Sequence, residues 1–137
     1  MSVDFLDALT AYLAHDAGVA ALAGARVFPA ELPAAEAASM PRGTIVLIPT
    51  GGLYAANNVP LQAPRVDVTC YGATPQQARL LSYAAQAALV SLARDAYAQC
   101  LLHSAVQGGG PLAGRTPEGW PYLWSSWIVR AGVEPVS

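Results

Sequence analysis

Apolar residues recur at helical spacing in two stretches near the N-terminus. Residues 16–23 are predicted to form a short helix that Asp16 caps and Gly24 ends, with Val19 and Leu22 pointing inward. Residues 3–14 are predicted to form a longer amphipathic helix, because its large apolar side chains fall on one side: Phe5, Leu6, Leu9, Tyr12 and Leu13.

The next patterns are typical of strands. Residues 44–48 are all either apolar or β-branched, which predicts a central strand buried on both faces and closed by Pro49. Residues 61–71 alternate between apolar and polar side chains, which predicts a strand with one buried face and one face that is exposed to solvent or contacts a partner. The two sides of that alternation are Val66, Val68 and Cys70 against Arg65, Asp67, Thr69 and Tyr71.

The second half of the chain is also predicted to form a helix followed by strands. Thr74 as N-cap, Pro75 at the first helical position and Gln77 in a capping box predict a helix over residues 74–93. Further strands are predicted at residues 99–106 and 122–131. Residues 29–42, 51–60 and 108–119 are rich in proline, glycine or asparagine and are predicted to be loops.

The predicted order is therefore α-α-β-β-α-β-β in a single domain, residues 1–137, with residues 132–137 as a flexible tail. Two strand pairs separated by a helix favour the α+β class. We expect one mostly antiparallel sheet, with four or slightly more strands and helices packed on one face.

Composition adds an expectation about assembly. Hydrophobic residues make up 54% of the chain and charged residues 12%. A surface with so few charges leaves apolar patches, which usually mark contacts with partners. We therefore expect an oligomer, with an alanine-rich monomer as the alternative. The seven basic residues are all arginine, scattered from Arg26 to Arg130, so sequence-specific nucleic-acid binding is not expected. The uncharged stretch at 43–64 is too interrupted to be a transmembrane helix.

Candidate chemistry is sparse. Residues 109–116 match the spacing of a phosphate-binding loop, with Arg115 in the lysine position, but the prolines that follow argue against the helix that such a loop requires. His15 and His103 lack partners at metal-ligand spacing, and Cys70 and Cys100 are predicted to be free thiols. We expect no catalytic residue, cofactor or metal, and a non-enzymatic role.

Aromatic and polar side chains on strands and loops are the better candidates for contacts. Trp124 and Trp127 lie on opposite faces of the closing strand, so one should be buried while the other faces a neighbour. The sequence leaves open which one it is. The candidate interface residues are Leu53, Tyr54, Asn57, Asn58, Arg65, Asp67, Tyr71, Arg115, Trp120, Trp124 and Trp127.

The order and spacing of these elements resemble the tail-terminator or tail-completion proteins of tailed bacteriophages, including those of gene transfer agents. The resemblance covers nearly the whole chain. The matching features are Ala8-Leu9 and Leu13, then Val19, Leu22 and Gly24, then Arg26-Val27-Phe28, a strand opened by Pro41, the strand at 65–71, the helix at 74–93 with Gln77-Ala78-Arg79-Leu80, and the aromatic strand at 122–129.

The resemblance implies a ring, usually hexameric, that sits on the last ring of tail-tube subunits, stops tube polymerisation and presents a surface to the head-completion protein. It implies a place in the virion at the head–tail junction, reached by assembly in the host cytoplasm. The loops at 51–60 and 107–119 are expected to project toward the lumen or the tube. The alternatives are a head-completion or neck adaptor protein, a small α+β hydrolase or ligand-binding domain, and a toxin-system or secretion component that reuses the fold.

Overall fold

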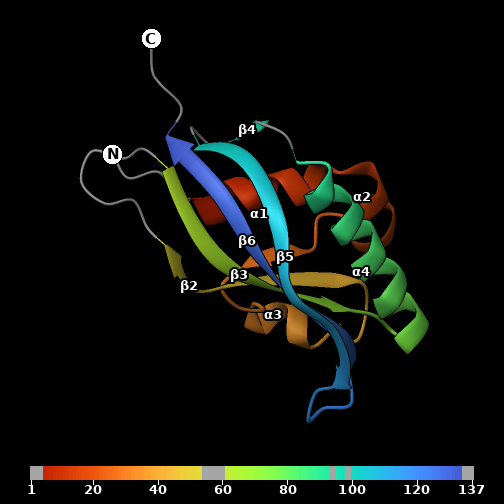
Figure 1. Ribbon diagram of the computed structural model, residues 1–137. Helices are drawn as coiled ribbons and strands as arrows, with labels where there is room; N and C mark the ends of the chain where they lie inside the picture. Colours follow the sequence, from red (N-terminus) through yellow and green to blue (C-terminus); the bar gives the residue numbers. More distant parts are fainter. Residues whose placement is uncertain (1–4, 54–60, 93–94, 98–99, 134–137) are drawn as a thin grey trace.

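The computed structural model describes residues 5–53, 61–92, 95–97 and 100–133 (Figure 1). Six strands form one sheet in the order β1-β2-β3-β6-β5-β4, in which β1 pairs with β2 in parallel and every other pairing is antiparallel. The predicted α+β class with a mostly antiparallel sheet is confirmed. The elements are α1 (Phe5–His15), α2 (Ala17–Ala23), β1 (Val27–Pro29), α3 (Ala34–Ala37), β2 (Thr44–Leu53), β3 (Leu61–Tyr71), α4 (Pro75–Val90), β4 (Asp95–Tyr97), β5 (Cys100–Arg115) and β6 (Pro121–Val133).

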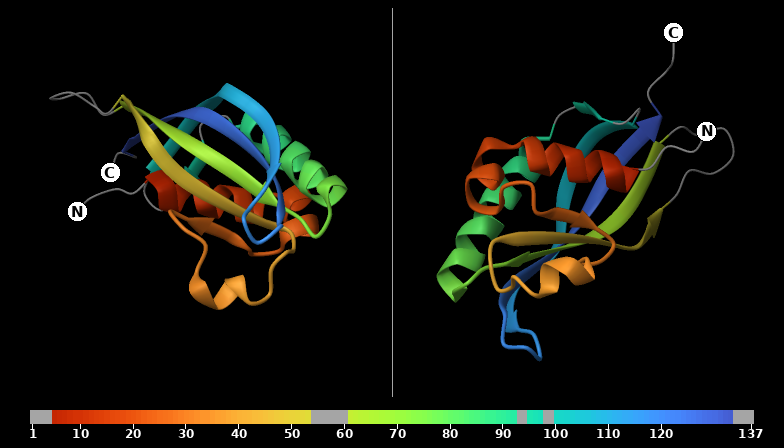
Figure 2. Two further views of the ribbon diagram at one scale, coloured as in Figure 1. Left: turned by 90° about the horizontal axis from the view of Figure 1, so that it is seen from below. Right: turned by 180° about the vertical axis from the view of Figure 1, so that it is seen from behind.

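The sheet curves around α1. This helix contacts β1 and β2 at one end of the sheet and β4 and β5 at the other, while α4 packs on β3, β5 and β6. Figure 2 shows α1, α2 and α4 together on the concave side of the sheet, and Figure 1 looks onto the strands with α1 behind them. The prediction that helices pack on one face is confirmed.

Local sequence signals set the helix ends as expected. Asp16 Oδ2 accepts a hydrogen bond from the Val19 N–H at 3.0 Å, and Gly24 ends α2 with φ +57°. Leu22 is a correction, because its side chain is 41% exposed rather than inward-facing. Val19 and Ala23, four residues apart on this short helix, take the inward positions and are fully buried.

The start of α4 follows the predicted capping pattern with one shift. The Gln77 N–H donates to Thr74 Oγ1 at 3.2 Å, and Pro75 occupies the first helical position. The Gln77 side chain accepts from the N–H of Ala73, one residue before the cap, at 3.1 Å. Both side chains therefore satisfy amides near the helix start that have no partner within the helix.

The core lies between the concave face of the sheet and the helices. The alternation predicted for β3 is confirmed, because its inward side chains are at most 1% exposed. Trp127 of β6 is also 1% exposed, and its Nε1 donates to Ser125 Oγ at 3.0 Å. The largest fully buried side chains are Trp127, Leu9, Leu13, Ile45, Leu47, Leu81, Leu89, Leu102, Val19, Val66, Val68 and Val129.

The prediction for β2 needs two corrections. Thr44 to Leu47 are buried, but Ile48 is 40% exposed, and the strand continues past Pro49 to Leu53. The strand can continue because β1 pairs only with residues 45–47, so one edge of β2 is free beyond them. A proline, which lacks the N–H that a ladder requires, is tolerated on such an edge.

The predicted loop at 108–119 is wrong, because residues 108–115 continue β5 and only 116–120 form the turn. The pairing of β5 with β6 shifts register between Gln107 and Gly109 and again between Gly109 and Leu112, which indicates bulges. Gly110 has φ +81°, and a Cβ there would lie 2.6 Å from the Trp124 carbonyl oxygen. The glycines therefore accommodate irregular strand geometry. Pro121 begins β6, so no helix follows this segment.

Candidate interaction surface

The convex side of the sheet is the face on which no described helix packs. Directly paired residues of antiparallel strands share a face, so Arg65 lies beside Ile128, Thr69 beside Trp124 and Tyr71 beside Tyr122. We call this surface the outer sheet face. Its members are Ile48, Thr50, Arg65, Asp67, Thr69, Tyr71, Val106, Leu112, Tyr122, Trp124, Ser126, Ile128 and Arg130.

Large apolar side chains are uncovered on this face. Ile128 is 38% exposed and Ile48 40%, while Val106 and Leu112 of β5 are 58% and 61% exposed. These positions would normally carry polar residues if the face were only solvated. Their exposure on neighbouring strands is typical of a surface that contacts another molecule.

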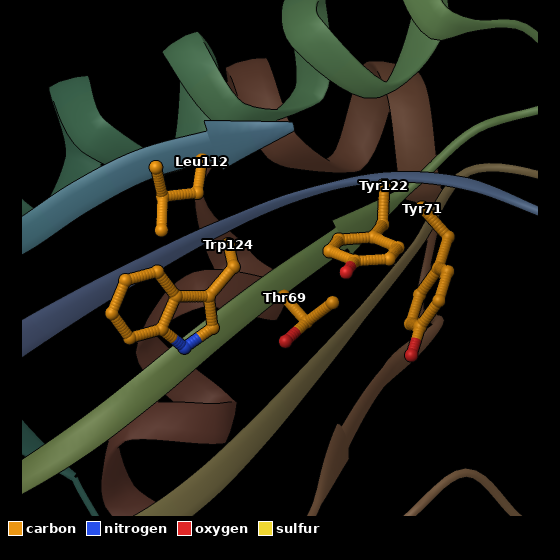
Figure 3. Close-up of a pocket in the computed structure, with 5 residues that line it drawn as sticks. All are labelled: Thr69, Tyr71, Leu112, Tyr122 and Trp124. Atoms are coloured by element: carbon orange, nitrogen blue, oxygen red, sulfur yellow. The ribbon is translucent and has the colours of Figure 1, made fainter. Parts of the chain in front are cut away.

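An aromatic cluster occupies one end of the outer sheet face. The Tyr71 ring meets Trp120 edge-on, with centroids 6.3 Å apart, and lies 6.2 Å from Tyr122 at an interplanar angle of 62°. Tyr71, Tyr122 and Trp124, with Thr69 and Leu112, line a hollow of about 300 Å³ (Figure 3). Burial raises the pKa of Tyr71, and nearby Tyr122 and Glu118 raise it further, so its phenol is neutral at physiological pH.

The turn of the β5–β6 hairpin holds Trp120 against this cluster. The Thr116 N–H donates to the Trp120 carbonyl at 3.0 Å, and the Trp120 N–H donates to Thr116 Oγ1 at 3.1 Å. Arg115 Nη1 donates to the Gly119 carbonyl at 3.0 Å. Figure 1 shows this turn beyond the body of the molecule, so a well-bonded tip adjoins the outer sheet face.

Arg65 lies across the middle of the outer sheet face. Its Nε donates to Ser126 Oγ at 2.7 Å, and its Nη2 lies 3.5 Å from where a Cβ would stand on Gly108. Ser126 has no exposed surface although it is on the convex side. The Arg65 side chain therefore crosses from β3 over β6 toward β5, in space that Gly108 leaves open.

Five of the candidates predicted from sequence come together on or beside this face: Arg65, Asp67, Tyr71, Trp120 and Trp124. Arg115 lies at the hairpin turn. Trp127 is a correction, because its burial in the core excludes it from a surface contact. Leu53 ends β2, and Tyr54, Asn57 and Asn58 lie outside the described residues.

The sequence reasoning missed several residues of the outer sheet face. Tyr122 and Ile128 follow from the same alternation that includes Trp124, so the signal was present. Val106 and Leu112 could not be predicted from the pattern, because the bulges in β5 interrupt its alternation and residue 112 was assigned to a loop. Ile48 was expected to be buried with the rest of its run.

A second set of uncovered apolar side chains lies on the helices. Leu22 of α2 and Leu80, Tyr83 and Val90 of α4 are between 41% and 71% exposed, and we call them the helical surface. A hollow of about 360 Å³ lies beside it, lined by Ala21, Leu22, Gly43, Gln77, Leu80 and Leu81. The chain thus has two different apolar surfaces, one on the sheet layer and one on the helix layer.

Other kinds of site find little support among the described residues. No group of three or more metal-ligating side chains comes together in them. Burial raises the pKa of the Cys70 thiol to about 12, so this cysteine is not a nucleophile at neutral pH. In the described part of the chain, no helix is both long and apolar enough to cross a membrane.

Comparison with known proteins gives a fold match. No family model matches the chain, and no curated protein matches it in sequence. Among solved structures, the chain is similar to one in the virion of a native gene transfer agent particle, with a TM-score of 0.66 and 19% sequence identity. The similarity covers 95% of this chain and 94% of the other. The two chains share one fold over almost their full lengths.

Proposed function

We propose that this chain is a structural subunit of a tailed phage or phage-like particle, and that it forms the ring that terminates the tail tube and receives the head. The observation that carries the proposal is the near-complete fold match to a chain of a gene transfer agent virion. Since fold alone does not determine function, the proposal also rests on the surfaces of this chain.

The two uncovered surfaces suit a ring. A closed ring uses head-to-tail contacts, in which one patch of a subunit meets a different patch of its neighbour. The outer sheet face and the helical surface are two such patches on opposite layers of the subunit. A monomer would leave both in water, which is unfavourable for residues such as Leu112 and Val90.

The hairpin turn supplies a contact in another direction. Residues 116–120 project beyond the sheet and carry polar groups fixed by hydrogen bonds. We propose that this tip reaches the tube or the head-completion protein rather than the next copy in the ring.

The test is deletion of the gene in the strain that carries it, followed by electron microscopy of its particles. A terminator predicts tails of uncontrolled length and heads without tails, and expression of the chain in trans restores both. The chain should also be detected by mass spectrometry in purified tails. Normal tail length in the deletion strain would refute the terminator role. Co-purification with filled heads instead of tails would identify a neck adaptor.

A further inference from the structure

We propose that Arg65 binds a carboxylate of a second copy of this chain, at the centre of a contact made by the outer sheet face. This inference rests on the proposed function, since it specifies the chemistry by which neighbouring subunits recognise each other.

The first support is the fixed position of the guanidinium. The hydrogen bond from Arg65 Nε to Ser126 Oγ fixes the side chain, and the space that Gly108 leaves open lets it lie flat on the sheet. Ser126 is fully buried and Gly108 has no side chain, so neither competes for the outward nitrogens. An arginine held in one orientation loses less conformational freedom on binding than a free one.

The second support is the unused hydrogen-bonding capacity of Arg65. Among the described residues the structure shows no ion pair for it and no hydrogen bond from Nη1 or Nη2. A guanidinium presents its donors as a fork that matches a carboxylate. Asp67, the nearby acid on the same face, accepts instead from Thr50 Oγ1 at 3.4 Å.

The third support is the apolar surroundings. Ile128 pairs directly with Arg65, Val106 lies beyond it on β5, and Trp124 reaches to 3.7 Å from the Cβ position of Gly109. A contact over these side chains excludes water from around the guanidinium, which strengthens its bond to a carboxylate. Arginine and tryptophan at the centre of an apolar patch are typical of residues that dominate binding energy.

Charge and exposed apolar side chains favour a second copy as the source of the carboxylate. The outer sheet face carries Arg65 and Arg130 against Asp67, and is net positive. Among the described residues, the helix layer formed by α1, α2 and α4 carries Asp7 and Asp16 against Arg79, and is net negative when histidine is counted as neutral. The helix layer also carries the apolar helical surface, so one copy provides both complements of the outer sheet face.

The absence of lysine from the sequence permits a direct test. The Arg65→Lys variant of the full chain introduces the only side-chain amine, which a carbodiimide joins to a carboxylate in direct contact. We would mix isotope-labelled and unlabelled Arg65→Lys protein, cross-link at high concentration and map the linked peptides by mass spectrometry. The expected product is a link between a labelled and an unlabelled chain. Its yield should be at least about tenfold above that from wild-type protein, in which the only amine is the N-terminus.

Arg42→Lys is the matched control. Arg42 already pairs with Glu36 in its own subunit, so its variant should give that link within one chain and no mixed-isotope product. Mixed-isotope product in equal yield from both variants would overturn the proposal. A link from position 65 only to Asp67 of the same chain would also overturn it.

Self-association provides a second measurement. We expect Arg65→Ala to raise the dissociation constant at least about 30-fold in sedimentation, the effect of losing a dominant interface residue, while Arg42→Ala changes it little. A wild-type chain that stays monomeric at every accessible concentration would overturn the second-copy assignment. So would a link from position 65 to a different virion protein in isolated particles. Either result leaves the deletion phenotype, and with it the proposed function, to be judged separately.

Discussion

Replacing each of two tryptophans on β6 tests which face of the sheet is the core. Trp127 points to the helices and is 1% exposed, whereas Trp124 lies on the outer sheet face beside a hollow. We expect Trp127→Ala to destabilise the folded chain severely and Trp124→Ala to destabilise it only slightly. The effect of Trp124→Ala should instead appear in self-association.

The magnitudes follow from burial and bonding. Truncating a buried tryptophan costs about 3–5 kcal/mol in transfer and cavity terms. Loss of the Nε1 bond leaves Ser125 Oγ, on a residue 2% exposed, without its donor, which adds about 1 kcal/mol. For 137 residues the unfolding entropy is about 0.3 kcal/mol/K, so Trp127→Ala lowers the Tm by roughly 13–20 °C. Trp124→Ala costs about 1 kcal/mol, or about 3 °C.

The assay is thermal unfolding by circular dichroism at a concentration at which the chain is monomeric. Trp127→Phe keeps a ring in the core but loses the indole bond, so its Tm should lie between those of wild type and Trp127→Ala. It also gives a measurable value if the alanine variant does not fold. Equal losses of Tm for the two alanine variants, or a larger loss for Trp124→Ala, would refute the assignment of the faces.

Substitutions and reactions at three further positions test local features. Thr74→Ala removes the N-cap of α4 and should cost about 0.5–2 kcal/mol in chemical denaturation, while Thr74→Ser retains most of the stability. Gly114→Ala places a Cβ 2.6 Å from the Tyr122 hydroxyl, so it should cost about 1–3 kcal/mol and change the near-ultraviolet dichroism, and an unchanged spectrum would contradict the packing. Cys70, whose pKa burial raises to about 12 from 9.0, should resist alkylation at pH 8 until urea unfolds the chain, as peptide mapping would show. Between pH 9 and 12 its thiol ionises in the unfolded chain but not in the folded one, so its contribution to stability falls as pH rises, and Cys70→Ala should remove that part of the pH dependence.

The elements that could be predicted from sequence are those whose signals are local. The cap of α4 is a contact between residues three apart, and the alternation of β3 needs no knowledge of its neighbours. Pairing is not local. That β3 lies between β2 and β6 follows from how the whole chain packs. The sequence could therefore indicate single residues of the outer sheet face, such as Arg65 and Tyr71, but not which strands bring them together.

The largest error in the sequence prediction has a physical cause. Glycine and proline usually interrupt strands, so Gly108 to Pro111 indicated a loop. In the structure β4 pairs only with residues 100–102 of β5, which leaves one edge of β5 free beyond them. On that edge a proline breaks no ladder, and bulges absorb the glycines. Gly108 of this segment leaves the space in which Arg65 lies, so the irregular strand and the candidate site are linked.

The mixture of apolar and charged groups on the outer sheet face bears on how a partner is chosen. Ile128 and Val106 would pack equally well against many different apolar surfaces, because hydrophobic contacts are not directional. Arg65 and Asp67 restrict that choice, because a surface without complementary groups would bury both charges without partners, at several kcal/mol each. The apolar side chains thus provide affinity while the two charges exclude wrong partners. Charge reversal at Arg65 should therefore weaken the correct contact more than a neutral Arg65→Gln change does, as competition sedimentation against wild-type chain would show.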